Sequence, residues 1–515
     1  MYETLLSLLL CTSASGVLVD RSLEAGARGR DVVDTVLYRI RRSRVFPDDD
    51  DFIRRVAYTE NMFGEDSWTY RPGYAGGLWN TDRFNMSQYD RPYRSISPKL
   101  RNIHEAIKKT MGIDWMQVTE ADLLKPLYSG LTAWIITELF RRQFPRPSNV
   151  VGQGEWWHDL YSAQRPVYGD FQNRTLELLI EDMRPFGGKI DLMLVVDGSC
   201  RVGMEAYASS LDSLARLVGV FDLREADVGL VVYSNRVTDK IPLTNDLTML
   251  ALQESIRSTD YPNNTANIYA GIMGAINEFQ TLPNARKESG APKLMVIFTD
   301  GNHTAGPDPG LAAEKAARAG IVTCAFGIGD AIDDGQLLRI ANNDADFKFK
   351  TESHYTLREQ IVRVAQRAKT MPQTLKMGSD TSVTMKDGDA KRYFLLEVPE
   401  EGATITLINA KGETRGYWTF TPEPPSSALY EGVLTEGETF ISPPRLGKYW
   451  RRRRTNLTMP PKNMLLTLQG VEADNRVTLW IDKGDVIGCG FAAAKFDVTY
   501  FLLSATFVIT TVLLK

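Results

Sequence analysis

Four apolar runs between residues 189 and 368 alternate with helical patterns, and this alternation constrains the fold more than any other feature. Continuous apolar strands separated by helices are typical of a mostly parallel sheet that is covered on both faces. We therefore expect a doubly wound α/β domain at residues 186–370. The runs are Ile190–Val196, Val228–Tyr233, Leu294–Phe298 and Ile321–Ile328, and the helical segments are Met204–Val220, Ile268–Phe279, Gly310–Ala319 and Thr356–Ala368.

Polar side chains follow two of these strands at the point where each strand ends. Asp197 and Ser199 come after the first strand, Asp300 comes after a later one, and Thr265 lies between them at the start of a helix. Ligands of such sheets bind at the carboxyl ends of the strands. Carboxylate and hydroxyl oxygens are ligands that suit Mg²⁺. The sequence therefore predicts a cation site at this edge.

The segment resembles the von Willebrand factor type A domain with its metal-ion-dependent adhesion site. The family pattern is Asp-x-Ser-x-Ser, a distant Thr and then Asp-Gly at a strand end, which Asp197, Ser199, Thr265 and Asp300 match. The resemblance implies Mg²⁺ or Mn²⁺ as cofactor and an extracellular protein or matrix component as partner. Arg201 replaces the second serine, and a guanidinium cannot ligate a cation. It would repel the metal, or replace it by pairing with Asp197 or Asp300.

Residues 30–185 are predicted to be helical, and Glu60 stands where one helix meets a loop rich in aromatic residues and glycine, Trp68–Asn80. A carboxyl group packed against apolar rings has a raised pKa and can act as a general acid. Aromatic faces also hold sugar rings, which makes Tyr70, Tyr74 and Trp79 candidate glycan contacts. In the alternative interpretation the tryptophans of this region pack in the core, as most large aromatic side chains do; they are Trp68, Trp79, Trp156 and Trp157.

Residues 45–160 resemble goose-type lysozymes and lytic transglycosylases. Glu60 matches their helix-terminal Glu, Gly77–Asn80 is similar to their Gly-Leu-Met-Gln loop, and Pro126–Gly130 is similar to a later helix. The resemblance implies glycan cleavage with Glu60 as the general acid. The chain departs from the family at Asn61, which replaces the usual Ser, and no motif fixes a second carboxylate.

From residue 374 to 486 the periodicity changes to two, and turn signals separate short runs rich in β-branched and aromatic residues. Many short strands at such spacing predict a β-sandwich. No catalytic or metal-binding pattern occurs there. The runs are Lys391–Val398, Thr404–Asn409, Arg415–Thr421, Asn463–Leu468 and Arg476–Ile481.

The two ends of the chain predict an extracellular location. Residues 1–16 read as a signal peptide, because a short apolar run is followed by small residues. Residues 498–514 read as a hydrophobic anchor, either a single membrane-spanning helix or a glycolipid-anchor signal. Five N-x-S/T sequons are candidate glycosylation sites in that compartment. They are Asn85, Asn173, Asn263, Asn302 and Asn456.

Net charge and cysteine content exclude some functional classes. Sixty Lys and Arg stand against 64 Asp and Glu, a net charge of -4, whereas a nucleic-acid binder would be basic. Once the end segments are set aside, Cys200 and Cys324 remain, and the sequence leaves open whether they pair. We expect a membrane-anchored adhesion or matrix-binding protein that uses a modified metal-ion-dependent adhesion site. The alternatives are a glycan-cleaving surface enzyme and, less favoured, an accessory subunit of a channel.

Overall fold

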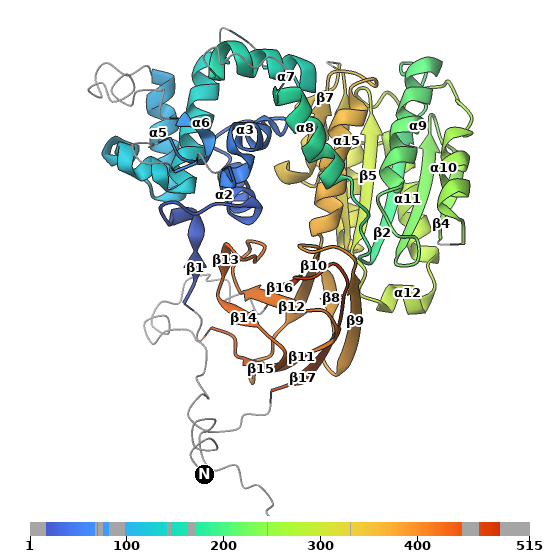
Figure 1. The fold of residues 1–515 in the computed structure, drawn as a ribbon. Helices are drawn as coiled ribbons and strands as arrows, with labels where there is room; N and C mark the ends of the chain where they lie inside the picture. The colour runs from blue at the N-terminus through green and yellow to red at the C-terminus, as the bar shows by residue number, and fades with distance from the viewer. Residues whose placement is uncertain are drawn as a thin grey trace, which may run out of the picture.

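The computed structural model describes residues that form a helical body, an α/β body and, beneath both, a body of two β-sheets (Figure 1). The described residues are 17–66, 69–70, 76–81, 98–141, 144, 146–162, 170–244, 246–329, 331–444 and 463–484. Several predictions concern other residues and so lie outside the described part of the chain. These are the signal (1–16), the anchor (498–514), Tyr74, Asn85 and Asn456.

The helical body surrounds one helix, α6, that is apolar on nearly every side. Helix α6 is buried along most of its length and contacts α2, α3 and α5, as expected for a helix without a polar face. The α-helices are α2 (Arg30–Ser43), α3 (Phe52–Asn61), α5 (Pro98–Met111), α6 (Pro126–Phe140), α7 (Val150–Trp156) and α8 (Asp170–Asp182). Short turns are η1 (Arg21–Leu23), η2 (Met62–Gly64), η3 (Gly77–Trp79), η6 (Trp115–Gln117), η7 (Glu120–Leu124) and η8 (Trp157–Tyr161).

The α/β body contains a sheet with the strand order β4-β3-β2-β5-β6-β7. Its strands are parallel except β4, which is antiparallel to β3. The strands are β2 (Ile190–Asp197), β3 (Ala226–Tyr233), β4 (Val237–Thr244), β5 (Lys293–Thr299), β6 (Ile321–Ile328) and β7 (Lys348–Thr351). The helices are α9 (Met204–Val218), α10 (Met249–Arg257), α11 (Ile268–Thr281), α12 (Asn284–Glu288), α13 (Pro309–Arg318), α14 (Asp334–Ile340) and α15 (Leu357–Thr370).

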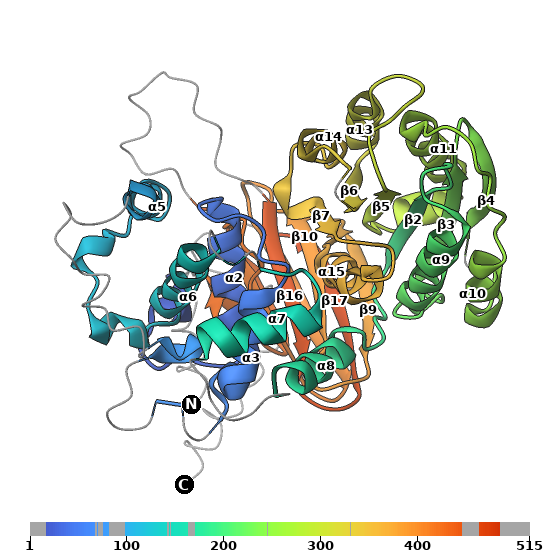
Figure 2. The same ribbon diagram turned by 90° about the horizontal axis from the view of Figure 1, so that it is seen from above.

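Helices cover both faces of this sheet, so the body is doubly wound as predicted. Figure 2 shows α9, α10 and α15 on one face and α11, α13 and α14 on the other. Alternate residues of β2 enter the two cores: Leu192 and Leu194 pack with the first group, and Met193 and Val195 with the second. The chain leaves β2 toward β3 on one side and later returns to β5 on the other, which creates a topological switch point at β2.

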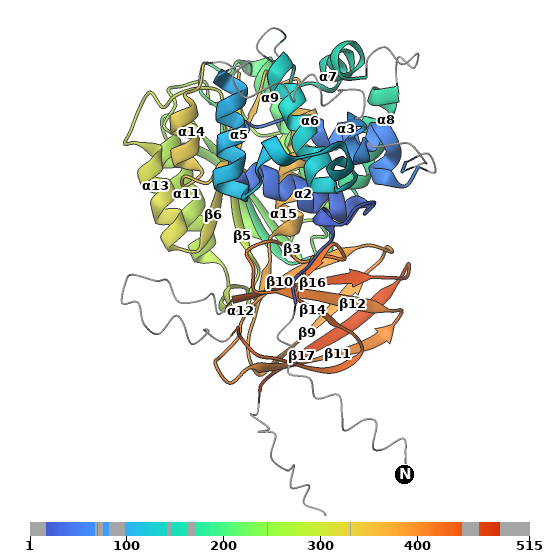
Figure 3. The same cartoon turned by 90° about the vertical axis from the view of Figure 1, so that its left-hand side faces the viewer.

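The third body consists of two sheets that share one apolar core (Figure 3). One sheet has the order β14-β12-β16-β10-β8 and the other β15-β11-β17-β9. All pairs are antiparallel except β8 with β10. The strands are β8 (Gln373–Leu375), β9 (Ser379–Met385), β10 (Lys391–Glu397), β11 (Ala403–Lys411), β12 (Thr414–Thr419), β14 (Gly432–Leu434), β15 (Gly437–Ile441), β16 (Asn463–Gly470) and β17 (Asn475–Lys483).

Charged side chains join the bodies. Arg363 of α15 donates to Asp48 Oδ1 at 2.6 Å, which ties the α/β body to the loop before α3. Asp31 of α2 pairs with Lys391 of β10 and accepts a hydrogen bond from Ser427 Oγ at 2.7 Å. Strand β1 (Val19–Asp20) pairs with β13 (Leu429–Tyr430), which continues this connection to the sheet body.

No helix among the described residues is both long enough and apolar enough to cross a membrane.

Candidate functional site

The predicted site residues lie at the carboxyl edge of the central sheet, beside the switch point. Asp197 ends β2, and Asp300 directly follows Thr299, which ends the neighbouring strand β5. Because these strands are parallel neighbours, their ends share one edge. The segment that carries Thr265 joins the same edge through hydrogen bonds from Asn263 N to Gly198 O (3.0 Å) and from Cys200 N to Asn264 O (2.7 Å).

Asp197 is held rigidly below the edge. It is 4% exposed, and its Oδ1 accepts a hydrogen bond from Ser199 N at 2.9 Å. Its Oδ2 accepts from the hydroxyl groups of Tyr233 (3.1 Å) and Thr299 (3.0 Å). Burial raises the pKa of Asp197, although these donors oppose the shift. Sequence analysis missed Tyr233 and Thr299 as partners, yet each is the last residue of its strand, so the strand-end rule could have found them.

Two buried oxygen atoms at this edge lack a hydrogen-bond partner among the described residues. They are Ser199 Oγ and Asp300 Oδ1. Burial is the main cause that raises the pKa of Asp300, and the negative charge of Asp197 adds to it. Arg201 opposes the shift, and the resulting pKa is about 6. Two neighbouring carboxylates disfavour each other's ionised form, and a nearby positive charge relieves this repulsion. The structure thus brings Asp197, Ser199 and Asp300 together, whereas the Thr265 side chain is exposed at the rim.

Arg201 supplies positive charge from one side of the edge. Its Nη2 donates to Asn302 O at 2.7 Å and lies 3.8 Å from Asp300 Oδ1. The guanidinium also lies against Gly301, where a Cβ atom would be only 2.3 Å from Nη2. Sequence analysis predicted that Arg201 would pair with Asp197 or Asp300, and in the structure its ion pair is with Asp300.

The donor set fits a small divalent cation. Open carboxylate and hydroxyl oxygens are hard ligands, and Mg²⁺ takes few of them from a protein because it keeps several waters. In the described part of the chain, no three His, Cys, Asp or Glu side chains gather as a metal-binding group. A cation at this edge would therefore depend on the hydroxyl groups and on water as well as on Asp197 and Asp300.

Glu60, the second candidate, lies near the end of α3, where two side chains bind its carboxylate. Asn80 Nδ2 donates to Oε2 at 2.6 Å, and Trp157 Nε1 donates to Oε1 at 3.0 Å. Glu60 itself is half-buried. Its neighbour Asn61 bridges two turns, since its Oδ1 accepts from Gly64 N (2.8 Å) and its Nδ2 donates to Leu78 O (2.9 Å). The structure therefore brings the predicted helix-terminal Glu and the predicted loop together.

The prediction that Trp79 contacts a glycan is wrong, because this side chain is 0% exposed. Its indole Nε1 donates to Ile53 O at 2.8 Å, and its ring packs beside Gly130 of α6. The core interpretation holds for this residue. Tyr70 is half-buried, and its hydroxyl donates to Ala27 O at 3.0 Å.

Three predicted sequons fall within the described residues. Asn173 is exposed on α8, and Asn263 and Asn302 are exposed on loops beside the strand-end site. Their glycosylation stays a prediction. Both described cysteines are free, with Cys200 exposed and Cys324 buried, so they do not pair with each other in this structure.

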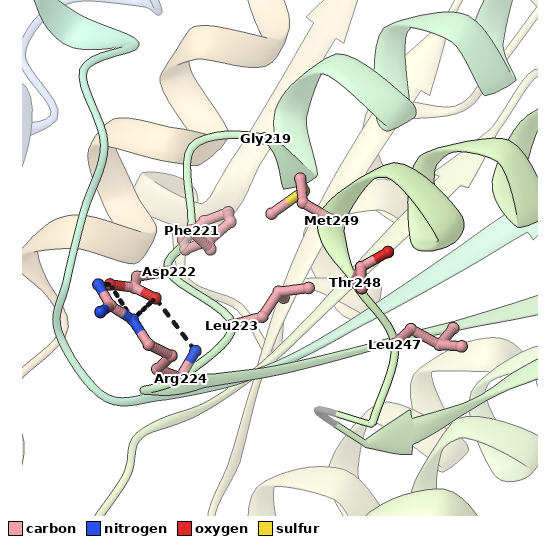
Figure 4. Close-up of a pocket in the computed structure, with 8 residues that line it drawn as sticks. All are labelled: Gly219, Phe221, Asp222, Leu223, Arg224, Leu247, Thr248 and Met249. Atoms are coloured by element: carbon pink, nitrogen blue, oxygen red, sulfur yellow. Dashed lines mark hydrogen bonds and ion pairs between the residues drawn. The ribbon is translucent and has the colours of Figure 1, made fainter.

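A cavity of about 450 Å³ lies at the opposite end of the sheet, near the start of β3 (Figure 4). It is lined mainly by apolar side chains, and Asp222 and Arg224 form an ion pair at its side. Its lining residues precede β3 and follow β4, so the cavity is separate from the strand-end site. The apolar lining residues are Phe221, Leu223, Leu247 and Met249.

Comparison with known proteins identifies the central body. The family model of the von Willebrand factor type A domain matches residues 191–363. Human matrilin-1 is 30% identical over 173 residues, which are 33% of this chain and 34% of matrilin-1. The mouse collagen alpha-4(VI) chain is 27% identical over 167 residues, 32% of this chain and 7% of that protein. The chain thus spans about a third or less of the length of these relatives.

Among solved structures, proximal thread matrix protein 1 from the mussel byssus, with a zinc-occupied metal-ion-dependent adhesion site motif, is 20% identical, with a TM-score of 0.33. The similarity covers 40% of this chain and 51% of that one. Residues 191–363 are a type A domain with homologues in matrilins and collagen VI, which confirms that resemblance. The family model does not extend to residues 30–185, so their resemblance to goose-type lysozymes stays a prediction.

Proposed function

We propose that this protein is an extracellular adhesion protein that binds a matrix component through the strand-end edge of its type A domain. The observation that carries the proposal is the convergence of Asp197, Ser199 and Asp300, where two buried oxygen atoms have no hydrogen-bond partner in the described part of the chain. Homology to matrilin-1 and collagen VI supports a matrix partner.

In this proposal Asp197, Ser199, Thr265 and Asp300 hold Mg²⁺ or Mn²⁺. When bound, the cation supplies a coordination position for a carboxylate of the ligand. The hydroxyl groups of Tyr233 and Thr299 fix the orientation of the Asp197 carboxylate, and burial excludes water from its inner side. Ser199 Oγ and Asp300 Oδ1, which lack hydrogen-bond partners among the described residues, are the oxygen atoms left to bind the cation.

The proposed location is the cell surface. It depends on a signal peptide at residues 1–16 and on an anchor at residues 498–514, either a glycolipid or a single membrane-spanning helix. Exposed Asn173, Asn263 and Asn302 would then carry glycans. Glycans on the last two would stand beside the adhesion edge and restrict which ligands approach it.

The test is binding of the full chain to immobilised matrix proteins, including fibrillar collagen and collagen VI, measured by surface plasmon resonance. Asp300→Asn and a chelator should each weaken binding at least about tenfold, which corresponds to about 1.4 kcal/mol. Asp212→Asn is the matched control, since Asp212 is an exposed α9 carboxylate that pairs with Arg216 at 2.9 Å. Binding that survives both the chelator and Asp300→Asn would refute the proposal.

A second candidate function is glycan cleavage at Glu60. The observation that favours it is that Asn80 and Trp157 fix the orientation of the half-buried Glu60 side chain beside the predicted loop. Tyr70 and Tyr74 stay candidate glycan contacts in this proposal.

Release of soluble fragments from peptidoglycan and from chitin oligosaccharides tests this candidate. Glu60→Gln should abolish the release, whereas Glu65→Gln, a nearby exposed carboxylate change, should leave it intact. If the wild-type chain releases nothing above background, the candidate is excluded for these substrates.

A further inference from the structure

We infer that Arg201 sets the cation affinity of the adhesion edge, because its guanidinium and a divalent cation are alternative partners of Asp300. The inference rests on the proposed function of this edge. It assigns a role to the one position at which the chain departs from the family's Asp-x-Ser-x-Ser pattern.

The guanidinium lies beside the site but forms no hydrogen bond with Asp300. Nη2 donates to Asn302 O at 2.7 Å, and the ion pair with Asp300 Oδ1 is longer, at 3.8 Å. No hydrogen bond from Arg201 reaches Asp300 Oδ1, which has no hydrogen-bond partner within the described ranges. The charge of Asp300 is therefore only partly compensated, and its buried Oδ1 atom still lacks a hydrogen-bond donor among the described residues.

A cation at this edge would meet the positive charge of Arg201 at short range. Like charges repel at such distances even when solvent screens them in part. The Arg201 side chain is 37% exposed, so it has a route into solvent that a buried arginine would lack. Entry of the cation would move the guanidinium off Asp300 and toward the ligand side, where it can pair with a carboxylate of an acidic partner.

Isothermal titration of Mn²⁺ into the full chain tests this competition. Arg201→Ala removes the charge and adds no ligand, so it should tighten Mn²⁺ binding by about tenfold or more. Arg201→Ser should tighten it further, because it also supplies a hydroxyl oxygen. Arg201→Lys keeps the charge and should stay within about threefold of the wild type.

Two further variants separate local competition from net charge and from misfolding. Gly301→Ala places a methyl group where Nη2 and Cζ of Arg201 now lie, at 2.3 and 2.5 Å, so it should displace the guanidinium and tighten binding without any charge change. Arg216→Ala is the control for net charge, because Arg216 is 61% exposed on α9 and pairs with Asp212. It should leave Mn²⁺ affinity unchanged.

The results distinguish this inference from the proposed function. Equal Mn²⁺ affinity of the wild type, Arg201→Ala and Gly301→Ala would overturn the competition while leaving the cation site standing. Binding by Arg201→Ala alone, with none by the wild type, would support competition in its strongest form. No binding by any variant would refute the cation site, and the inference with it.

Discussion

Replacing Arg286 with methionine should destabilise the central sheet, and the loss should depend on pH. Arg286 lies on α12, at the end of the sheet opposite the adhesion edge. Its Nε lies 2.6 Å from Asp191 Oδ1 and 3.0 Å from Asp227 Oδ2. Its two other nitrogens donate to Glu225 O (2.9 Å) and Ile190 O (2.8 Å). A single side chain thus contacts one oxygen of each of two carboxylates and two carbonyl groups.

The magnitude follows from the burial of these groups. Asp191 is 0% exposed and Asp227 is 6% exposed, so Arg286→Met leaves two adjacent carboxylates without a cation. Breaking a buried ion pair by removing one partner costs about 3–5 kcal/mol. We expect a loss of this size at pH 8.

The sign of the pH dependence follows from Asp191. Burial raises its pKa to about 6, although Arg286 opposes the shift, so the variant should raise this pKa further. A carboxyl whose folded pKa exceeds its unfolded value binds protons preferentially in the folded state. Acidification therefore stabilises the variant more than the wild type. The loss should shrink by about 1–2 kcal/mol between pH 8 and pH 5, since one pKa unit corresponds to about 1.4 kcal/mol.

Alkylation of Cys324 measures this loss within the sheet itself. Cys324 is 1% exposed on β6, and burial raises the pKa of its thiol to about 12, so it reacts when the sheet opens. The ratio of the alkylation rate of Cys324 to that in the unfolded chain at the same pH gives the equilibrium constant for opening. The logarithm of this constant gives the free energy of opening. Arg318→Met, at an arginine 79% exposed on α13, is the control. A loss under about 1 kcal/mol, or one that is equal at both pH values, would contradict the reasoning.

Three more predictions concern packing and buried charge. Gly130→Val should lower stability by about 1–3 kcal/mol, seen as a lower melting temperature, because a Cβ atom there would lie 2.7 Å from Val36 Cγ1. Burial alone would raise the pKa of Asp51, but the charge of Arg54 and other arginines lowers it to about 2. Asp51→Asn should therefore cost about 2–3 kcal/mol of stability at pH 7 and little at pH 2. Thermal unfolding across pH checks this. Burial lowers the pKa of His354 to about 4, so the wild type should lose about 3 kcal/mol of stability between pH 6.5 and pH 4 as the unfolded chain takes up the proton. His354→Gln should abolish this loss, as measured by thermal unfolding across the same pH range.

The sequence predicted the central sheet because its strands are buried on both faces and so read as unbroken apolar runs. Strand β4, Val237–Thr244, was missed, since an edge strand with alternating polar residues carries no such run. Asp197, Ser199 and Asp300 could be predicted because parallel strands end at one edge. The hydroxyl partners of Asp197, Tyr233 and Thr299, also end neighbouring strands, so the same rule applied to every polar strand end would have included them.

Local sequence could not distinguish buried aromatic side chains from exposed ones in the helical body. Trp79 follows a turn and resembles an exposed loop residue, yet α6 covers it, because Gly130 leaves room for the indole ring. Such burial depends on contacts distant in sequence. The apolar content of α6, by contrast, is visible in the sequence and marks it as the centre of this body.

The pairing of β1 with β13 has a consequence for how a force applied to the two ends of the described chain would be transmitted. A pull between residue 19 and residue 483 passes directly from β1 into the sheet body, so the type A domain stays outside the load path. Two paired residues form this strand contact, Val19 with Tyr430 and Asp20 with Leu429, and the Arg39–Glu423 and Asp31–Lys391 pairs reinforce it. Once these yield, the same pull runs through the adhesion domain. For a pull applied between these two residues, the β1–β13 contact would have to break before force passes along the chain through the type A domain.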